Sequence, residues 1–178
     1  MVALLLAAVS SEARRYSVST NILGYLYLGT INMEASYGLS QHWSVNAGAR
    51  FNPFTFRLPG DGRQFQNRQQ SYDIGVRLWP WHIFSGWWVA AKVKYEEYNA
   101  GGIFSQETEE GDGVGIGLSA GYSYMLHPNL NIEFGVGLWS GVKKYTVYDC
   151  PACGLTVDSG TKGFIMPNEI LLSLVYVF

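Results

Sequence analysis

The feature that most constrains the fold of this chain is an alternation of apolar side chains with small or polar ones at every second position. It is clearest in residues 113–126, where valine, isoleucine, leucine, alanine and tyrosine alternate with glycine and serine. Because successive side chains of a strand point to opposite faces of a sheet, this period predicts a β-strand with one wholly apolar face. The same pattern returns in residues 17–28, 30–40, 43–54, 71–79, 87–98, 130–145 and 164–178. The sequence therefore predicts an all-β protein of about eight strands.

The connections between these segments alternate in length. Short connections follow the second, fourth and sixth segments, at 41–42, 80–86 and 127–129, and long polar ones follow the third, fifth and seventh, at 57–70, 99–112 and 149–162. Only the short connection after the first segment departs from this rule. Outer-membrane barrels have short periplasmic turns at one end and longer outer loops at the other. We therefore expect a single antiparallel up-and-down transmembrane β-barrel with both termini in the periplasm.

The composition of the polar face separates a membrane barrel from a water-soluble one. A soluble carrier barrel would expose this face to water and would need many charges there, whereas here it is mostly glycine, serine and asparagine. Buried charges are costly unless they are paired, so we expect the isolated inward charges to compensate one another and to leave no pore. The predicted interior charge network comprises Glu34, Arg50, Asp73, Arg77, Lys92, Lys94, Glu96, Glu133, Lys143 and Glu169.

Aromatic residues gather near the ends of the predicted strands, and amphipathic rings favour the headgroup level of a membrane. The predicted membrane-interface aromatics are Trp43, Trp79, Trp81, Trp87, Trp88, Tyr124, Tyr176 and Phe178. The alternative interpretation is the aromatic-rich core of a soluble protein. Hydrophobic residues make up 48% of the chain. Since no run of about 18 apolar residues occurs, we expect no membrane-spanning helix.

Residues 1–13 are apolar and rich in alanine, and they end in small residues. We expect a secretory signal peptide that is cleaved near Ala13, followed by a barrel domain over residues 16–178. The segment lacks a basic beginning, so the true start could lie upstream. A buried first strand or helix is the alternative. Export would place Cys150 and Cys153 in an oxidising compartment.

Three short strings add a resemblance to this pattern: STN at 19–21, NMEA at 32–35 and WSVN at 43–46. With them, the chain resembles the small eight-stranded outer-membrane barrels of OmpA and OmpX type from Gram-negative bacteria. It is most similar to an uncharacterised outer-membrane barrel family labelled as a domain of unknown function. The resemblance implies contact with outer-membrane lipid and lipopolysaccharide. The aromatic Phe178 resembles the signal that the barrel-assembly machinery reads, which implies that machinery as a folding partner. The family has no established catalytic residues, so none is carried over.

Cys150 and Cys153 form a CxxC motif in an expected outer loop. A tetrahedral zinc site needs four ligands, and the sequence has no second CxxC. A loop disulfide is the plain interpretation, while a metal site shared by two copies and free thiols stay open. His42, His82 and His127 fall in the short turns, away from the expected outer rim. We therefore expect no catalytic site, no metal and no cofactor.

The remaining charges favour no particular ligand. The net charge is −2 and no basic stripe is present, so nucleic acid is not an expected partner. The acidic stretch 106–112 and the basic residues of 57–68 lie in neighbouring expected loops, where solvation, headgroup contact and mutual pairing all stay open. We expect a non-enzymatic barrel with a structural role, or one that presents three long loops to an envelope or surface protein. The alternatives are a subunit of a fimbrial or other envelope assembly system, a small-solute or lipid channel, and a lipid-modifying enzyme.

Overall fold

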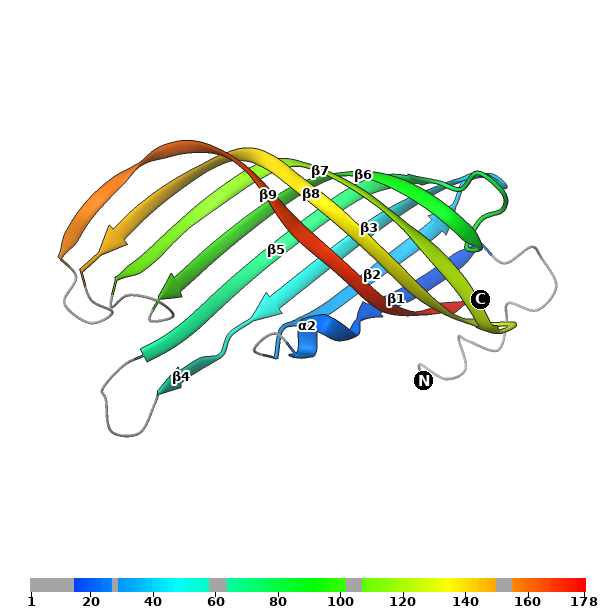
Figure 1. Cartoon of the computed structure of the whole chain (residues 1–178), viewed down its shortest axis with the longest axis horizontal. Helices are drawn as coiled ribbons and strands as arrows, with labels where there is room; N and C mark the ends of the chain where they lie inside the picture. The colour runs from blue at the N-terminus through cyan, green and yellow to red at the C-terminus, as the bar shows by residue number, and fades with distance from the viewer. Residues whose placement is uncertain (1–14, 27–28, 58–63, 102–106, 150–154) are drawn as a thin grey trace.

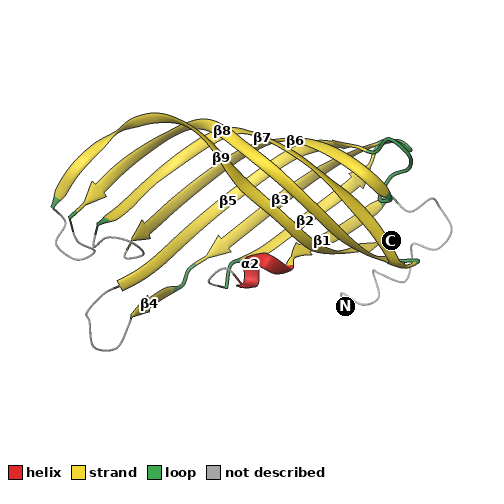
Figure 2. Ribbon diagram, in the orientation of Figure 1, coloured by secondary structure: helices red, strands yellow, loops and turns green. Residues whose placement is uncertain are grey.

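A computed structural model describes residues 15–26, 29–57, 64–101, 107–149 and 155–178, without the side chains of 56–57, 64–66 and 168–169. The elements in chain order are β1 (Tyr16–Asn21), α2 (Ile22–Leu26), β2 (Ile31–Gly38), β3 (Trp43–Asn52), β4 (Thr55–Arg57), β5 (Gln64–Leu78), β6 (Gly86–Gly101), β7 (Thr108–His127), β8 (Leu130–Tyr148) and β9 (Thr156–Val177). Figure 2 shows that the described part is almost entirely strand, with the short helix α2 at the lower edge of the barrel, near the middle of its length.

The strands form one closed antiparallel barrel (Figure 1). β1 pairs with β2 and β2 with β3, β5 to β8 each pair with the next strand along the chain, and β1 pairs with β9 to close the ring. β3 and β4 pair with successive parts of β5, so the nine strands make an eight-stranded ring. Pro53, which has no amide hydrogen, lies at the break between them, and Asn52 Oδ1 accepts a hydrogen bond from the amide of Phe54 at 3.0 Å. The predicted all-β up-and-down barrel is confirmed.

The alternation in the sequence decides which side chains face the interior. Apolar residues point outward: Ile116 is 61% exposed and Val136 is 66% exposed. Their sequence neighbours point inward, and several of these on β7 and β8 are glycine, whose missing side chain leaves room for the residues opposite. At Gly121, for example, a Cβ would lie 2.5 Å from Trp88 Cζ2. Glycine on β7 therefore makes room for the large interior side chain of Trp88 on β6.

The first strand is shorter than the sequence predicts. The alternation suggests a strand over residues 17–28, but β1 ends at Asn21 and the chain turns into α2. Asn21 Oδ1 accepts a hydrogen bond from the amide of Leu23 at 3.1 Å, which is how a helix N-cap satisfies a free amide. A Cβ on Gly24 would lie 2.4 Å from the Asn32 side chain, so the helix packs closely on β2. The prediction for this segment was wrong because a capping side chain outweighs a weak alternation.

Several strands continue into the stretches predicted as long loops. β5 already begins at Gln64, β7 at Thr108 and β9 at Thr156, while β6 runs to Gly101. The pairing explains this extension, because register continues without a break from Lys143 opposite Lys162 to Val147 opposite Asp158. β9 is 22 residues long and β1 only 6. The wall formed by β5 to β9 therefore extends well past β1 to β3 at one end of the barrel (Figure 1).

Candidate functional site

Charged side chains from four strands meet near the middle of the barrel. Arg77 of β5 donates from Nη2 to Glu34 Oε1 of β2 at 2.8 Å and from Nη1 to Glu133 Oε2 of β8 at 3.0 Å. Lys92 of β6 lies 2.6 Å from Glu34 Oε2 and 3.4 Å from Asp73 Oδ1. The side chain of Arg77 is only 6% exposed. We call these five residues the charged layer, and each of their charges has an opposite charge in contact, as a buried ion requires.

Below the charged layer, toward the short turns, the interior contains a cluster of apolar side chains. Arg77 Cζ lies 4.2 Å from the ring centre of Trp88 and 5.5 Å from that of Trp79, so the guanidinium rests on aromatic faces. Trp79 also donates from Nε1 to Ser44 Oγ at 3.0 Å. Around these rings pack the buried residues Ile83, Phe84, Ala90, Val175 and Val177.

This apolar cluster corrects two of the predicted interface aromatics. Trp79 is 0% exposed and Trp88 is 1% exposed, so both lie inside the barrel and not at its outer surface. Trp88 lies four positions before Lys92 on β6. Because residues an even number of positions apart point to the same face of a strand, Trp88 faces inward as Lys92 does. The other predicted interface aromatics lie on the outer surface, with Phe178 half-buried: Trp43, Trp81, Trp87, Tyr124, Tyr176 and Phe178.

The turn between β5 and β6 enters the barrel and is anchored there. The carbonyl of Phe84 accepts hydrogen bonds from Asn131 Nδ2 at 2.6 Å and from Ser123 Oγ at 3.4 Å. The amide of Ile83 donates to the carbonyl of Gln41 at 2.8 Å. Phe84 has a φ of 60°, a left-handed conformation that costs energy for a residue with a side chain. The surrounding contacts hold this strained residue in place, so the turn is a fixed part of the interior.

A second group of charges lies on the other side of the charged layer, toward the extended strands. Lys94 Nζ is 2.5 Å from Glu96 Oε2 and 4.3 Å from the ring centre of Trp139. Further along, Lys143 Nζ is 2.6 Å from Glu109 Oε1. Of the predicted network, the charged layer forms one group, Lys94 and Glu96 form a separate pair, and Lys143 pairs with Glu109. Arg50 is half-buried between the charged layer and the pair of Lys94 and Glu96, and the side chain of Glu169 lies outside the described residues.

Glu109 is an inward-facing charge that the sequence analysis assigned to an acidic loop. Tyr98 donates from its hydroxyl to Glu109 Oε1 at 2.6 Å, and Lys143 bonds the same oxygen. Partial burial opposes ionisation of this carboxyl, but the hydrogen bonds from Lys143 and Tyr98 outweigh it and hold the pKa of Glu109 below its ordinary value. The same burial and the neighbouring carboxylate raise the pKa of Tyr98. Extending the alternation from Gly113 back to residue 109 would have predicted that Glu109 faces the interior.

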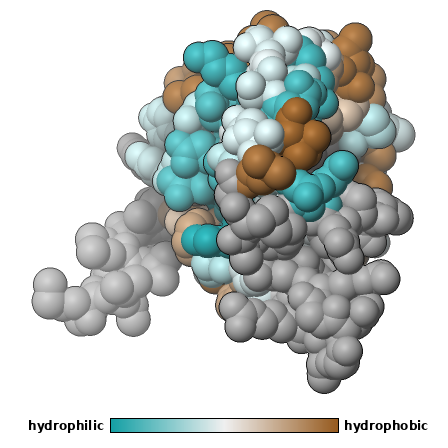
Figure 3. Space-filling model, turned by 90° about the vertical axis from the view of Figure 1, so that its left-hand side faces the viewer, coloured by the Kyte–Doolittle hydropathy of each residue, from teal (hydrophilic) through white to brown (hydrophobic). Residues whose placement is uncertain are grey.

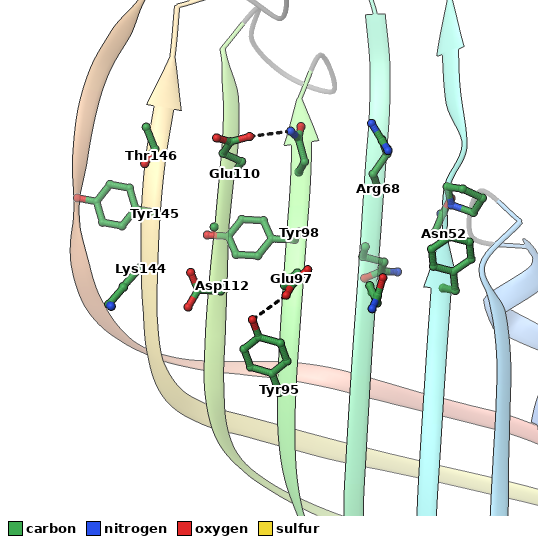
Figure 4. A pocket seen from close by; sticks show the side chains of 16 residues that line it. Asn52, Arg68, Tyr95, Glu97, Tyr98, Glu110, Asp112, Lys144, Tyr145 and Thr146 are labelled. Atoms are coloured by element: carbon green, nitrogen blue, oxygen red, sulfur yellow. Dashed lines mark hydrogen bonds between the residues drawn. The ribbon is translucent and has the colours of Figure 1, made fainter. Parts of the chain in front are cut away.

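Two hollows lie at the extended end of the barrel. One, of about 640 Å³, is lined by interior side chains such as Lys94 and Glu96 together with residues of α2 and β9. The other, of about 560 Å³, is a groove on the outward face of β5 to β8, where Figure 4 shows Glu97, Asp112 and Lys144 on neighbouring strands. Figure 3 faces this end and shows hydrophilic surface next to hydrophobic surface there. Both hollows bring charged groups and apolar groups together.

The chain was also compared with known proteins. A family model described as "Protein of unknown function (DUF3575)" matches residues 1–178. The chain belongs to this family. The expectation of an uncharacterised barrel family is thereby confirmed, while the likeness to the OmpA and OmpX type stays a prediction. Among curated proteins, none matches the sequence.

Several predictions for this DUF3575 chain concern residues outside the part that the structure describes. The signal peptide over 1–13 and the CxxC motif of Cys150 and Cys153 lie outside the described residues. Within the part of the chain that the structure describes, no three side chains of histidine, cysteine, aspartate or glutamate are placed to hold a metal ion. The same part contains no helix with the length and hydropathy needed to cross a membrane.

Proposed function

We propose that this protein is an integral β-barrel of the outer membrane of a Gram-negative bacterium, non-enzymatic, with a structural or surface-interaction role. The observation that carries the proposal is the outward-facing apolar band. It spans residues 87–95 in β6 and 114–124 in β7, close to the about 9–11 residues with which a tilted strand crosses a bilayer. At about 3.3 Å per residue and a tilt of about 40°, ten residues rise about 25 Å, the height of such a band.

The band ends at a row of polar side chains on the same outward face. Neighbours in this row are cross-strand partners on β5 to β9: Gln70, Glu97, Asp112, Lys144 and Thr161. The preceding outward row holds Tyr72, Tyr95, Val114 and Val142. A side chain in a membrane barrel meets lipid chains first, then headgroups and then water. The change from an apolar and aromatic row to a charged row matches this order. The groove of Figure 4 lies at this boundary, where Arg68 and Lys144 could contact lipopolysaccharide phosphates.

The side chains inside the barrel support a structural role for the protein rather than a role as a channel. The charged layer crosses the interior from β2 to β8, and the apolar cluster with the β5–β6 turn fills the space beneath it. An ion or polar solute would have to separate buried salt bridges and then pass an apolar zone, and both steps are costly. We therefore propose that the barrel is closed to solutes.

The two ends of the barrel differ in a way that supports a periplasmic location for both termini. The amide of Tyr16 donates to the carbonyl of Phe178 at 3.1 Å, and the amide of Phe178 donates to Tyr16 at 2.9 Å. This pair lies at the end with the short turns, opposite the extended ends of β5 to β9 (Figure 1). Short turns face the periplasm in outer-membrane barrels. Folding by the barrel-assembly machinery is part of the same proposal.

The first experiment tests membrane insertion. The purified chain is refolded into phosphatidylcholine liposomes, and its gel mobility is compared with and without boiling, together with its resistance to carbonate extraction. We expect a heat-dependent shift and retention in the membrane fraction. A chain that folds in detergent-free buffer and stays in the supernatant would refute the proposal.

The second experiment tests the role. Planar bilayers containing the protein are expected to show no conductance steps, and steps would instead support the channel alternative. The refolded barrel is then used to capture envelope proteins, in parallel with variants in which residues 58–63, 102–106 or 150–154 are replaced by short glycine–serine linkers. Loss of a captured protein with one linker only would support surface interaction through that segment. Capture of assembly subunits would favour the fimbrial alternative, and capture of no protein by the intact barrel would favour a purely structural role.

A further inference from the structure

The barrel wall is incomplete between β1 and β9. β1 pairs with β9 from Ser17 opposite Val177 to Asn21 opposite Ser173. β9 continues back to Thr156, but β1 does not follow it, because the chain turns into α2 after Asn21. Among the described strands, none pairs with this edge of β9 beyond Ser173. The ring is therefore closed by strand pairing over only part of its height.

Asn21 satisfies the backbone where the pairing stops. Its Nδ2 donates to the carbonyl of Ile170 at 2.9 Å, and its Oδ1 accepts from the amide of Leu172 at 3.2 Å. One side chain thus takes the place of the next residue in the ladder while it also caps α2. Close beyond it on β9 lies Pro167, which has no amide hydrogen to leave unpaired at an open edge. The chemistry of these residues suits a wall that ends at this point.

The incomplete part of the wall lies at the depth of the apolar band. Ile170 is opposite Val136, and Pro167 is opposite Leu138, in the middle of the outward apolar run of β8 over 132–142. At this depth the surroundings proposed above are lipid chains and not water. In this part of the wall α2 lies beside β9 in place of a paired strand, and we call this unpaired part of the wall the lateral notch.

The lateral notch leads into the hollow of about 640 Å³, a volume within the usual range of small-molecule sites. Its outer lining is apolar, with Leu23 and Leu26 from α2 and Pro167 and Ile170 from β9. Leu26 is 78% exposed and Ile170 is 70% exposed, so both present apolar surface to whatever surrounds them. The inner lining is polar and includes Asn32, Arg50, Gln69, Lys94 and Glu96. The hollow is thus amphipathic, with its apolar side toward the membrane.

We propose that the lateral notch binds an amphiphile with one acyl chain along the apolar side chains of α2 and β9 and an anionic headgroup in the hollow. The acyl chain fits the apolar edges of α2 and β9, and the headgroup fits beside Arg50 and Lys94, which line the hollow together with Glu96 among the described residues. Lys94 already lies beside Glu96 and over Trp139, so it is held at the inner end of the hollow. This inference rests on the proposed membrane location. A protein strand that pairs with the open edge of β9 is the competing occupant.

The test uses a photoreactive probe, palmitic acid with a diazirine in the middle of its chain, added below saturation to phosphatidylcholine nanodiscs containing the full chain. Cross-linked peptides are mapped by mass spectrometry. We expect label on α2 and on residues 164–172, in excess over Ile74 and Val93 on the opposite side of the ring. Label spread evenly around the outward band, as from surrounding lipid only, would overturn the proposal. Label confined to β5 to β8 would do so as well.

Charge variants test the headgroup position. Lys94→Gln should reduce label at the notch about tenfold, the usual effect of losing one charge-assisted contact. Glu96→Gln should raise it, and a photoreactive alkyl trimethylammonium probe should give the opposite order. Lys144→Gln makes the same charge change on the outward face and should leave notch labelling unchanged. Equal labelling in all variants would refute the headgroup assignment. If Lys94→Gln does not fold, the opposite responses of the two probes to Glu96→Gln decide the question.

The two proposals fail in distinguishable ways. A chain that does not enter nanodiscs refutes the membrane location itself. A chain that enters them, shifts on heating and shows no preferential notch label refutes only the amphiphile site. A label that disappears when a peptide with the sequence of β1 is added would favour strand pairing over lipid at this edge.

Discussion

Replacing Arg77 by methionine removes the cation that joins two carboxylates inside the barrel. The structure loses two charge-assisted hydrogen bonds, of 2.8 Å to Glu34 and 3.0 Å to Glu133. Glu34 keeps Lys92 at 2.6 Å, but the remaining negative charge stays buried. Removing one partner of a buried ion pair costs about 3–5 kcal/mol, and we expect a loss of that size in the free energy of unfolding. Methionine keeps much of the side-chain length, so packing changes contribute little.

The assay is equilibrium urea unfolding in phosphatidylcholine liposomes, followed by tryptophan fluorescence and by gel mobility. Because Trp88 lies 4.2 Å from the guanidinium, the folded-state spectrum should also change. The double variant Arg77→Met with Glu133→Gln should recover a large part of the loss, since it removes the uncompensated charge. Arg68→Met, on the exposed face of β5, serves as the control and should cost under about 0.5 kcal/mol. A loss below about 1 kcal/mol for Arg77→Met, or no recovery in the double variant, would refute the reasoning.

Three further predictions follow from other parts of the barrel. Val136→Arg places a charge in the outward apolar band and should lower the free energy of unfolding in liposomes by about 2–4 kcal/mol. Thr161→Arg, at the polar boundary, should lower it by about 0–1 kcal/mol. Equal losses for the two variants in urea titrations would count against the membrane band. Because the pKa of Glu109 is below its ordinary value of 4.5, its stabilisation is complete above that value and is lost as the pH falls through the lowered pKa. Glu109→Gln should therefore flatten the acid limb of the stability–pH curve, and an unchanged limb would contradict the assignment. Gly121→Val should strain the β7–β8 pairing and displace the Trp88 ring, because a Cβ there would lie 2.1 Å from the carbonyl oxygen of Phe134 and 2.5 Å from Trp88 Cζ2. A red-shifted emission spectrum would report the displaced ring, and an unchanged spectrum would contradict the close contact.

The alternation of the sequence is sufficient for the fold class because the barrel reverses side-chain environment at every residue. On β7 the outward series from Val114 to Tyr124 and the inward glycines are both predicted correctly. The same rule also carries information that was not used. Trp88 shares its parity with Lys92, and Glu109 shares its parity with Gly113, so strict alternation would have put both inside. In these two cases the prediction followed residue type instead of the alternation. It placed an aromatic residue at the membrane interface and an acidic residue in a loop.

Other features are not encoded in a period of two. β1 ends because the side chain of Asn21 makes three hydrogen bonds, and two of their partners are about 150 residues away in the sequence. The entry of Phe84 into the interior depends on Asn131 and Ser123 from distant strands. Such contacts are decided by the three-dimensional arrangement of the ring. The partners within the charge network likewise follow from strand order and stagger, which the sequence alone does not specify.

The anchored turn between β5 and β6 also couples two parts of the barrel that are distant in the sequence. Ile83 and Phe84 belong to the same buried cluster as Val175 and Val177, the stretch of β9 that hydrogen-bonds with β1 to complete the ring. Packing of the turn and closure of the ring therefore stabilise each other, and a substitution that loosens one is expected to weaken the other.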